Sequence, residues 1–181
     1  TYGVDPVIAR IVRNREVTDK EELDSFFHPS IERLYDPGLL KDASKAAQLI
    51  HTKICQQKKI RIIGDYDIDG IFSTYILYDG LKACGACVDY TLPHRIRDGY
   101  GLSEKLIRDA YEQGCDTILT CDNGIAAAAE IDLAKQLGMT VIVTDHHEVP
   151  LHWEGDTSIA VLPAADAVVD PKRTDCAYPC K

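Results

Sequence analysis

Three aspartates stand two residues apart in the segment 64–70, Gly-Asp-Tyr-Asp-Ile-Asp-Gly, which directly follows an apolar run. Side chains alternate between the two faces of an extended segment, so we expect Asp65, Asp67 and Asp69 to point the same way. Their charges would then repel one another, and a divalent metal ion is the simplest way to relieve that repulsion. The alternative is an ordinary turn, since Asp and Gly are common turn residues.

Two further apolar runs also end in aspartates. One run is followed by Asp122, and another is followed by three candidate ligands in succession, Asp145, His146 and His147. In open α/β sheets, ligands bind beyond the carboxyl ends of the strands. We therefore expect the acids and the two histidines to converge at one crevice.

These side chains suit a transition-metal site. Carboxylates and imidazoles together favour Mn²⁺ and related ions, whereas an all-oxygen set favours Mg²⁺ or Ca²⁺. The predicted metal ligands are Asp67, Asp69, Asp122, Asp145, His146 and His147. This set is large enough for two ions about 3.5–4 Å apart, which can activate a water molecule and stabilise the leaving oxygen of a phosphoryl displacement. Hydrolysis of a phosphate ester or anhydride is the expected reaction.

Two arginines could hold the substrate near these metals. Arg95 and Arg97 lie in a loop-like stretch, and a guanidinium fork can bind a phosphate. The alternative is that both are solvated loop charges. Tyr66, inside the aspartate segment, either stacks on a base or packs against the loop, and its residue type favours neither.

The elements that must position these residues follow an alternating pattern. From residue 59 onward, short apolar runs alternate with helical patterns, which is typical of a parallel sheet with crossover helices. We predict an α/β fold, a parallel sheet of about five strands with helices on both faces. The predicted strands are residues 60–64, 87–92, 117–121, 140–144 and 167–169. The predicted helices are residues 71–83, 103–113 and 125–137, and we expect residues 148–166 to form loops.

Residues 1–57 are predicted to form a helical N-terminal segment without chemistry of its own. Asp5 with Pro6 is expected to start a first helix. Thr18 and Glu21 form a capping-box pattern for a second helix, and Asp42 is expected to cap a third.

The composition narrows the class of protein. Of 181 residues 45% are hydrophobic, and 29 acids against 20 bases give a formal net charge of −9. This balance argues against a nonspecific nucleic-acid-binding surface, which is usually basic, but a local phosphate site remains compatible with it. We find neither an apolar run of about 18–20 residues nor a signal pattern, so we expect a cytoplasmic protein without membrane contact.

The seven cysteines fit a reducing compartment better than a disulfide framework, because their number is odd. A zinc site is the alternative reading of four of them, Cys84, Cys87, Cys176 and Cys180. Their pairs differ in spacing and lie far apart in the chain, so we expect structural or incidental cysteines.

Three motifs together resemble a known superfamily. Residues 65–70, 121–125 and 145–147 are similar to the first three motifs of the DHH phosphodiesterase superfamily. Residues 64–67, 93–102 and 169–172 narrow the resemblance to the RecJ single-strand-specific DNA exonucleases. The resemblance covers nearly the whole chain.

The resemblance implies an activity and a set of site residues. It implies 5′-to-3′ degradation of single-stranded DNA with Mn²⁺ or Mg²⁺, in DNA recombination and repair, through attack of a metal-activated water on the phosphodiester. The catalytic residues that it implies are Asp65, Asp67, Asp69, Asp122, His146 and His147. Asp170 stands where the family is expected to carry Asn, so no catalytic role is assigned to it.

The resemblance also implies missing parts. The family carries a further catalytic aspartate downstream, a second catalytic domain and an oligonucleotide-binding fold. We therefore expect residues 58–181 to be a DHH phosphodiesterase domain truncated at its C-terminal end. Its expected partners are single-stranded DNA, metal ions and the absent C-terminal domains, and the chain alone is expected to have weak or no processive activity.

Two other functions remain open. The first is a DHH hydrolase that acts on short oligonucleotides, cyclic dinucleotides or pyrophosphate, although the loop at residues 95–102 argues against it. The second is a nonenzymatic scaffold that binds DNA or replication proteins. Metal titration separates the scaffold from the two enzymes.

Overall fold

A computed structural model describes residues 3–97, 99–155 and 157–180 of the chain. The chain divides into two compact units, Thr1–Asp36 and Pro37–Lys181. Asp98, which belongs to the stretch 93–102 singled out above, lies outside the described residues.

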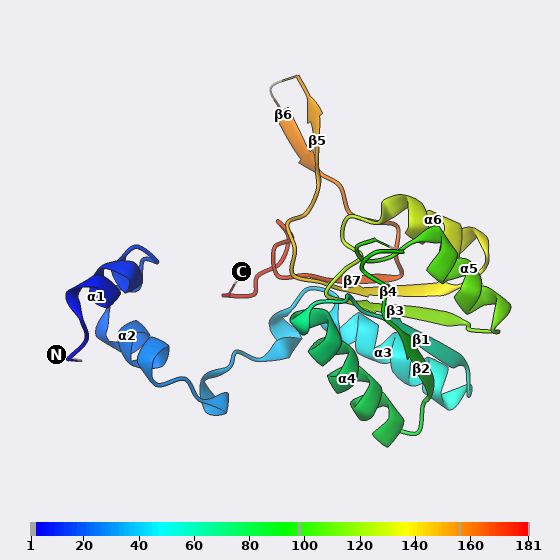
Figure 1. Cartoon of the computed structure of the whole chain (residues 1–181), viewed down its shortest axis with the longest axis horizontal. Coiled ribbons are helices and arrows are strands. Elements are labelled where there is room, and N and C mark those ends of the chain that lie inside the picture. The colour runs from blue at the N-terminus through cyan, green and yellow to red at the C-terminus, as the bar shows by residue number, and fades with distance from the viewer. Residues whose placement is uncertain (1–2, 98, 156, 181) are drawn as a thin grey trace. The chain divides into compact units, whose positions relative to one another are not determined.

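The second unit is built on a parallel five-stranded sheet with the strand order β2-β1-β3-β4-β7 (Figure 1). Its strands are β1 (Lys59–Ile63), β2 (Cys87–Thr91), β3 (Thr117–Cys121), β4 (Thr140–Thr144) and β7 (Ala167–Val169). The central strand β3 and its neighbour β1 are almost fully buried, because helices cover both faces of a parallel sheet. The predicted α/β fold with a parallel sheet is confirmed.

Helices lie on both faces of this sheet (Figure 1), and an apolar core fills the space between the sheet and the helices on each face. Helices α5 (Glu104–Glu112) and α6 (Ala128–Gln136) cover one face, where Ile107 and Ile131 are fully buried. Helices α3 (Ala43–Cys55) and α4 (Ile68–Ala83) cover the other face. The helices thus hold the strands in place, and the loops that follow β1, β3 and β4 emerge at the same edge.

Helix α3 belongs to the sheet unit. The sequence pattern groups it with the N-terminal segment, but Ala46, Leu49 and Ile50 pack into the core between this helix and the sheet. The compact unit accordingly begins at Pro37, while a domain boundary after residue 57 stays a prediction.

The first unit carries α1 (Pro6–Arg13) and α2 (Lys20–Phe27). Asp5 caps α1 as predicted, because its carboxylate accepts a hydrogen bond from Val7 N. The predicted capping box for α2 is wrong by one residue. Asp19 accepts from Glu22 N at 2.8 Å, and the Glu22 carboxylate accepts from Thr18 N.

Asp42 does not cap α3 with its side chain, contrary to the prediction. It has a left-handed backbone with φ 62° and makes no side-chain capping bond. Its carboxylate instead accepts hydrogen bonds from Val168 N at 3.2 Å and from Arg173 Nη1 at 2.9 Å. The Arg173 Nη1 group also donates to Val168 O, so both outward-facing backbone groups of Val168 on β7 have partners.

The prediction of loops throughout residues 148–166 is wrong, because this stretch contains an antiparallel hairpin. Strands β5 (Leu151–Glu154) and β6 (Thr157–Ala160) pair and project beyond the sheet (Figure 1). Nearly all of their residues are exposed, so the hairpin adds little to the apolar core. Residues Leu151–Glu154 do alternate between apolar and polar types, which is a strand signal in the sequence.

A buried arginine links β1 and β2. The Arg61 side chain is only 6% exposed and donates through Nε and Nη2 to the carboxylate of Asp89, its neighbour in register. Burial alone would raise the pKa of Asp89, but hydrogen bonds from Arg61 and Lys59 outweigh burial and lower it. The pair therefore stabilises the fold while Asp89 is ionised.

We expect Asp89→Asn to lower the free energy of unfolding by about 1–2 kcal/mol at about pH 7, since water partly screens this carboxylate. Because the native pKa of Asp89 lies below its ordinary value of about 3.9, the stabilisation is present above that value and is lost as pH falls through the native pKa. Urea unfolding at about pH 7 and about pH 3 measures both effects. The control is Asp132→Asn, at an exposed position on α6, and an equal loss at both pH values would contradict the ion-pair explanation.

Candidate metal centre

The acids that follow β1, β3 and β4 meet at the carboxyl edge of the sheet. Two groups of ligand atoms gather there, each with its atoms within 4.8 Å of one another. One group consists of Asp65, Asp67 and Asp122, and the other of Asp122, His146 and His147. Asp122 belongs to both groups, so it lies at the centre of the cluster.

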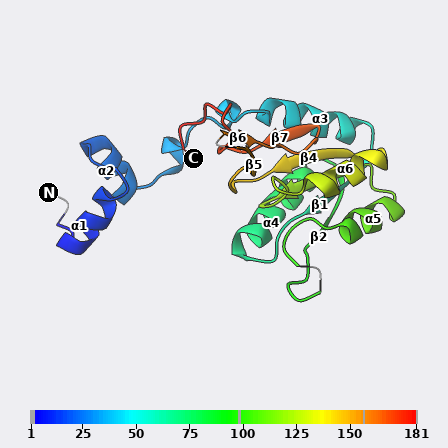
Figure 2. The same ribbon diagram turned by 90° about the horizontal axis from the view of Figure 1, so that it is seen from above.

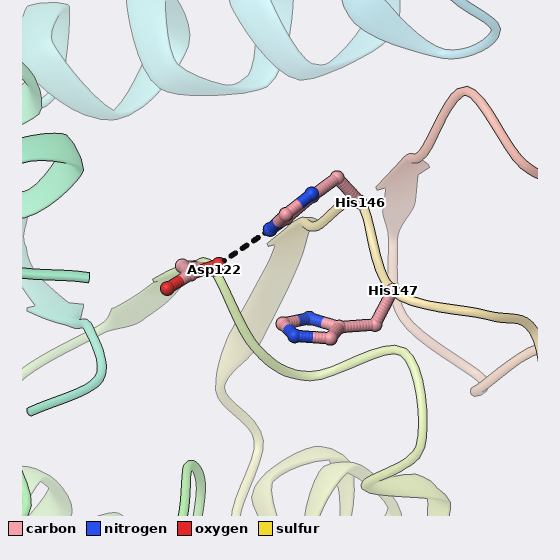
Figure 3. A group of neighbouring side chains, drawn as sticks. All are labelled: Asp122, His146 and His147. Carbon is pink, nitrogen blue, oxygen red and sulfur yellow. Dashed lines mark hydrogen bonds and ion pairs between the residues drawn. The ribbon is translucent and has the colours of Figure 1, made fainter. Parts of the chain in front are cut away.

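Asp122 has an unusual conformation for a residue with a side chain. Its φ of 61° is left-handed, and its carboxylate is 5% exposed. Oδ1 lies 2.8 Å from His146 Nε2. The dashed line in Figure 3 marks this contact. Burial, with a smaller contribution from the charge of Asp67, raises the pKa of Asp122. The fold thus holds a carboxylate in a place where its charge is poorly solvated, which is a feature of functional sites.

The aspartate segment does not continue as an extended chain, so the prediction that its three acids share one face is wrong. Helix α4 begins at Ile68, three residues earlier than predicted, and Asp67 is its N-cap, accepting from Gly70 N at 3.0 Å. Asp69 therefore lies in the first helical turn and belongs to neither ligand group of the described residues. It lines a cavity of 520 Å³ together with Asp122 and His146.

Asp65 is fully buried and connects the cluster to the loop before α5. Its Oδ1 accepts from Gly101 N at 3.2 Å, whereas Oδ2 has no hydrogen-bond partner among the described residues. Asp122 Oδ2 is buried and unpartnered in the same way. Buried carboxylate oxygens are rarely left without a partner, and the Asp122 carboxylate also lies beside two imidazoles. This donor set fits a divalent cation such as Mn²⁺.

Both oxygens of Asp145 are occupied by protein donors. Oδ2 accepts from Ile125 N at 2.9 Å, and Oδ1 accepts from the backbone N–H groups of His146 and His147. Oδ1 also lies 2.7 Å from His147 Nδ1. Asp145 therefore orients the histidine pair, and its oxygens are less available to a cation than those of Asp122.

Tyr100 is a site residue to which the sequence analysis gave no role. Its hydroxyl lies 3.0 Å from His147 Nε2 and 3.2 Å from the backbone oxygen of Asp122. Burial and the surrounding carboxylates raise the pKa of Tyr100, so the phenol stays protonated. In the sequence, the feature that marks Tyr100 is its position between two glycines, Gly99 and Gly101. Both glycines have positive φ, a conformation that residues with side chains rarely adopt.

The two predicted phosphate-binding arginines occupy an exposed loop that extends from the sheet between β2 and α5 (Figure 2). The guanidinium of Arg95 lies over the ring of Tyr66, 5.5 Å from its centroid. Arg97 donates its backbone N–H to His94 O, and its side chain is exposed. The structure thus connects Arg95 to the aspartate segment through Tyr66.

Comparison with known sequences gives the family. Residues 59–181 match the DHH family, N-terminal domain. The chain belongs to the DHH family. Over 178 residues it is 39% identical to the single-stranded-DNA-specific exonuclease RecJ of Bacillus subtilis, covering 98% of this chain and 22% of that protein. Over 177 residues it is 35% identical to the Escherichia coli protein of the same name, covering 97% of this chain and 28% of that protein.

Solved structures show the same likeness. A manganese-bound exonuclease RecJ superposes with a TM-score of 0.64 and 38% identity, covering 75% of this chain and 32% of that one. RecJ of Thermus thermophilus in complex with Mn²⁺ superposes with a TM-score of 0.59 and 28% identity, covering 96% of this chain and 25% of that one. This DHH-family chain spans about a quarter of the length of these curated relatives.

Among its described residues, no helix is long and apolar enough to cross a membrane.

Proposed function

We propose that this chain carries part of the metal centre of a single-stranded-DNA-specific exonuclease that hydrolyses phosphodiester bonds with Mn²⁺ or Mg²⁺. The observation that carries the proposal is the pair of ligand groups that share Asp122. The RecJ relatives support the substrate, and the manganese-bound RecJ structures support the metal. The 5′-to-3′ polarity, the role in recombination and repair, and the cytoplasmic location are parts of the same proposal.

The proposed metal ligands are the residues of the two groups, with Asp69 at the rim of the adjoining cavity. Bound divalent ions supply Lewis acidity and lower the pKa of a coordinated water. Asp145 acts by orienting His147, since it accepts the hydrogen on Nδ1 and thereby leaves Nε2 unprotonated in the neutral ring. Arg95 contacts a substrate phosphate from the loop beside the cluster.

Two alternatives have separate tests. A DHH hydrolase of short substrates would turn over dinucleotides, cyclic dinucleotides or pyrophosphate faster than long single strands. A nonenzymatic scaffold would bind DNA without a metal site. Processive degradation requires that the enzyme stay bound to the DNA, and in the longer relatives further domains would contribute to that binding. We therefore expect weak or no processive degradation by these 181 residues alone.

The affinity for Mn²⁺ should fall on the acidic side of neutrality. Burial lowers the pKa of His147, but the hydrogen bond and charge of Asp145 outweigh burial, so the net pKa is raised. A histidine ligand must be neutral, and the decline should therefore begin above the ordinary histidine value of about 6.5. Calorimetric titration with Mn²⁺ between about pH 8 and about pH 5 measures it.

Asp145→Asn is the matched variant for this titration. It removes the charge that raises the pKa of His147, so the decline should begin at lower pH than in the wild type. A Mn²⁺ affinity that stays constant over the whole range would count against His146 and His147 as ligands.

A further inference from the structure

Tyr66 stands inside the aspartate segment, between Asp65 and Asp67, and its ring is half-buried. The Arg95 guanidinium lies over that ring at 5.5 Å from its centroid. The ring of Tyr100 meets it in a T-shaped contact, with centroids 6.3 Å apart and an interplanar angle of 88°. Tyr66 therefore contacts two residues of the loop that precedes α5, Arg95 and Tyr100.

The segment on both sides of Tyr66 is held in place. Asp65 is fully buried and accepts from Gly101 N, and Asp67 caps α4 through Gly70 N. The backbone of Tyr66 is thus fixed by its neighbours. Arg95, by contrast, belongs to an exposed loop and has a long, flexible side chain.

A guanidinium over an aromatic face is attracted by the negative potential of the ring. This contact limits the conformations of Arg95 and keeps its charge beside Tyr66, whose neighbours Asp65 and Asp67 belong to the carboxylate cluster. A phosphate group bound there would be attracted to both the guanidinium and bound cations. The same contact covers a face of Tyr66 that a nucleobase would need for stacking. Among the described residues, Arg97 has no comparable contact with an aromatic ring, although both arginines are exposed.

We propose that Tyr66 is a positioning residue: its ring holds the Arg95 guanidinium next to the metal centre so that Arg95 binds a phosphate of single-stranded nucleic acid. In this role Tyr66 acts through Arg95 and does not stack on a base. The inference rests on the proposed function, because it takes Arg95 as the phosphate-binding arginine.

A double-mutant cycle on DNA binding tests the inference. The probe is a fluorescent single-stranded thymidine hexamer, and its affinity for the whole chain is measured by anisotropy with Ca²⁺ in place of Mn²⁺. Tyr66→Leu should weaken binding about two- to fivefold, as expected for a partly exposed cation–π contact. Tyr66→Phe keeps the ring and should restore nearly wild-type affinity. Arg95→Gln should weaken binding at least as much as Tyr66→Leu.

The double variant decides between the two roles of Tyr66. If Tyr66 acts through Arg95, adding Tyr66→Leu to Arg95→Gln causes no further loss. If the two losses multiply, Tyr66 contacts the DNA itself and the inference is wrong. Tyr111→Leu, which removes a half-exposed tyrosine from α5, is the control for losing an aromatic ring elsewhere on the surface.

Two further readouts separate positioning from damage to the fold. The Arg95 Hε resonance should carry a ring-current shift that Tyr66→Leu removes and Tyr66→Phe preserves. Calorimetric Mn²⁺ affinity should stay unchanged in all these variants, because neither side chain belongs to the ligand groups.

These measurements distinguish a failure of the Tyr66 inference from a failure of the proposed function. If Arg95→Gln weakens binding and Tyr66→Leu does not, the inference fails while the proposed phosphate contact stands. If Arg95→Gln has no effect, both fail. If the wild type binds no Mn²⁺, the proposed function itself fails, whatever the hexamer shows.

Discussion

Asp122→Asn should abolish metal binding while the chain remains folded. Asparagine keeps the size of the side chain, tolerates the left-handed backbone at this position and can still accept a hydrogen bond from His146. It removes the negative charge that both ligand groups share. We expect calorimetric Mn²⁺ affinity to fall by a factor of about 100 or more. At a metal concentration near 100 times the wild-type Kd, the ligand-induced stabilisation should fall from about 2.7 kcal/mol to about 0.4 kcal/mol or less.

The same variant should behave differently without metal. Because burial and the charge of Asp67 raise the native pKa of Asp122, its ionised form destabilises the metal-free fold once pH rises above the ordinary aspartate range. Asp122→Asn in the presence of a chelator should therefore melt at a higher temperature than the wild type at neutral pH, and the difference should shrink as pH falls. Asp132→Asn on α6 should change neither Tm nor metal affinity. An Asp122→Asn protein that still gains stability from Mn²⁺ would refute the metal centre described here.

The second large effect concerns Gly70. A Cβ added to this residue would lie 2.5 Å from Asp65 N and 2.6 Å from Asp65 O, and these backbone atoms cannot swing away as a flexible side chain would. We expect Gly70→Ala to lower the free energy of unfolding by about 3 kcal/mol or more, because the helix and the strand end must move apart. Urea unfolding measures the change.

Helix α4 provides its own control for this substitution. Gly80 lies on the same helix with no atom within 4 Å of an added Cβ, so Gly80→Ala should be neutral or stabilise the protein by up to about 1 kcal/mol. The displacement in Gly70→Ala moves Asp65 away from the cluster, so Mn²⁺ affinity should also fall. Equal stability and metal affinity in the two alanine variants would show that the close approach of Gly70 to Asp65 is unnecessary.

The sheet and the place of the acids could be predicted because both depend on local pattern. Strands such as Thr117–Cys121 and Thr140–Thr144 are short, largely apolar runs in the sequence because both of their faces are buried. Each run is followed by an aspartate at the same edge of the sheet. The rule that parallel strands present their carboxyl ends together then brings Asp122 and Asp145 to one site.

The finer geometry could not be predicted because it depends on competing local preferences and on distant partners. Asp67 is as suitable for an N-cap as for a metal ligand, and the helix that it caps takes Asp69 out of the ligand groups. The roles of Asp145 and Tyr100 depend on donors and acceptors that only the folded chain brings near, such as Ile125 N and His147 Nε2. The ligand roles of the individual residues stay predictions for the experiments above.

The contacts of Asp42 and Arg173 with Val168 also affect whether a further strand can pair with β7. β7 is an edge strand, and an edge strand normally has unpaired N–H and C=O groups with which another chain can form hydrogen bonds. Here the outward pair on Val168 is already bonded to two side chains that also bond each other. A sixth strand, or the edge of another molecule, would have to break an ion pair before it could hydrogen-bond there. The two residues therefore protect this side of the sheet against edge-to-edge aggregation.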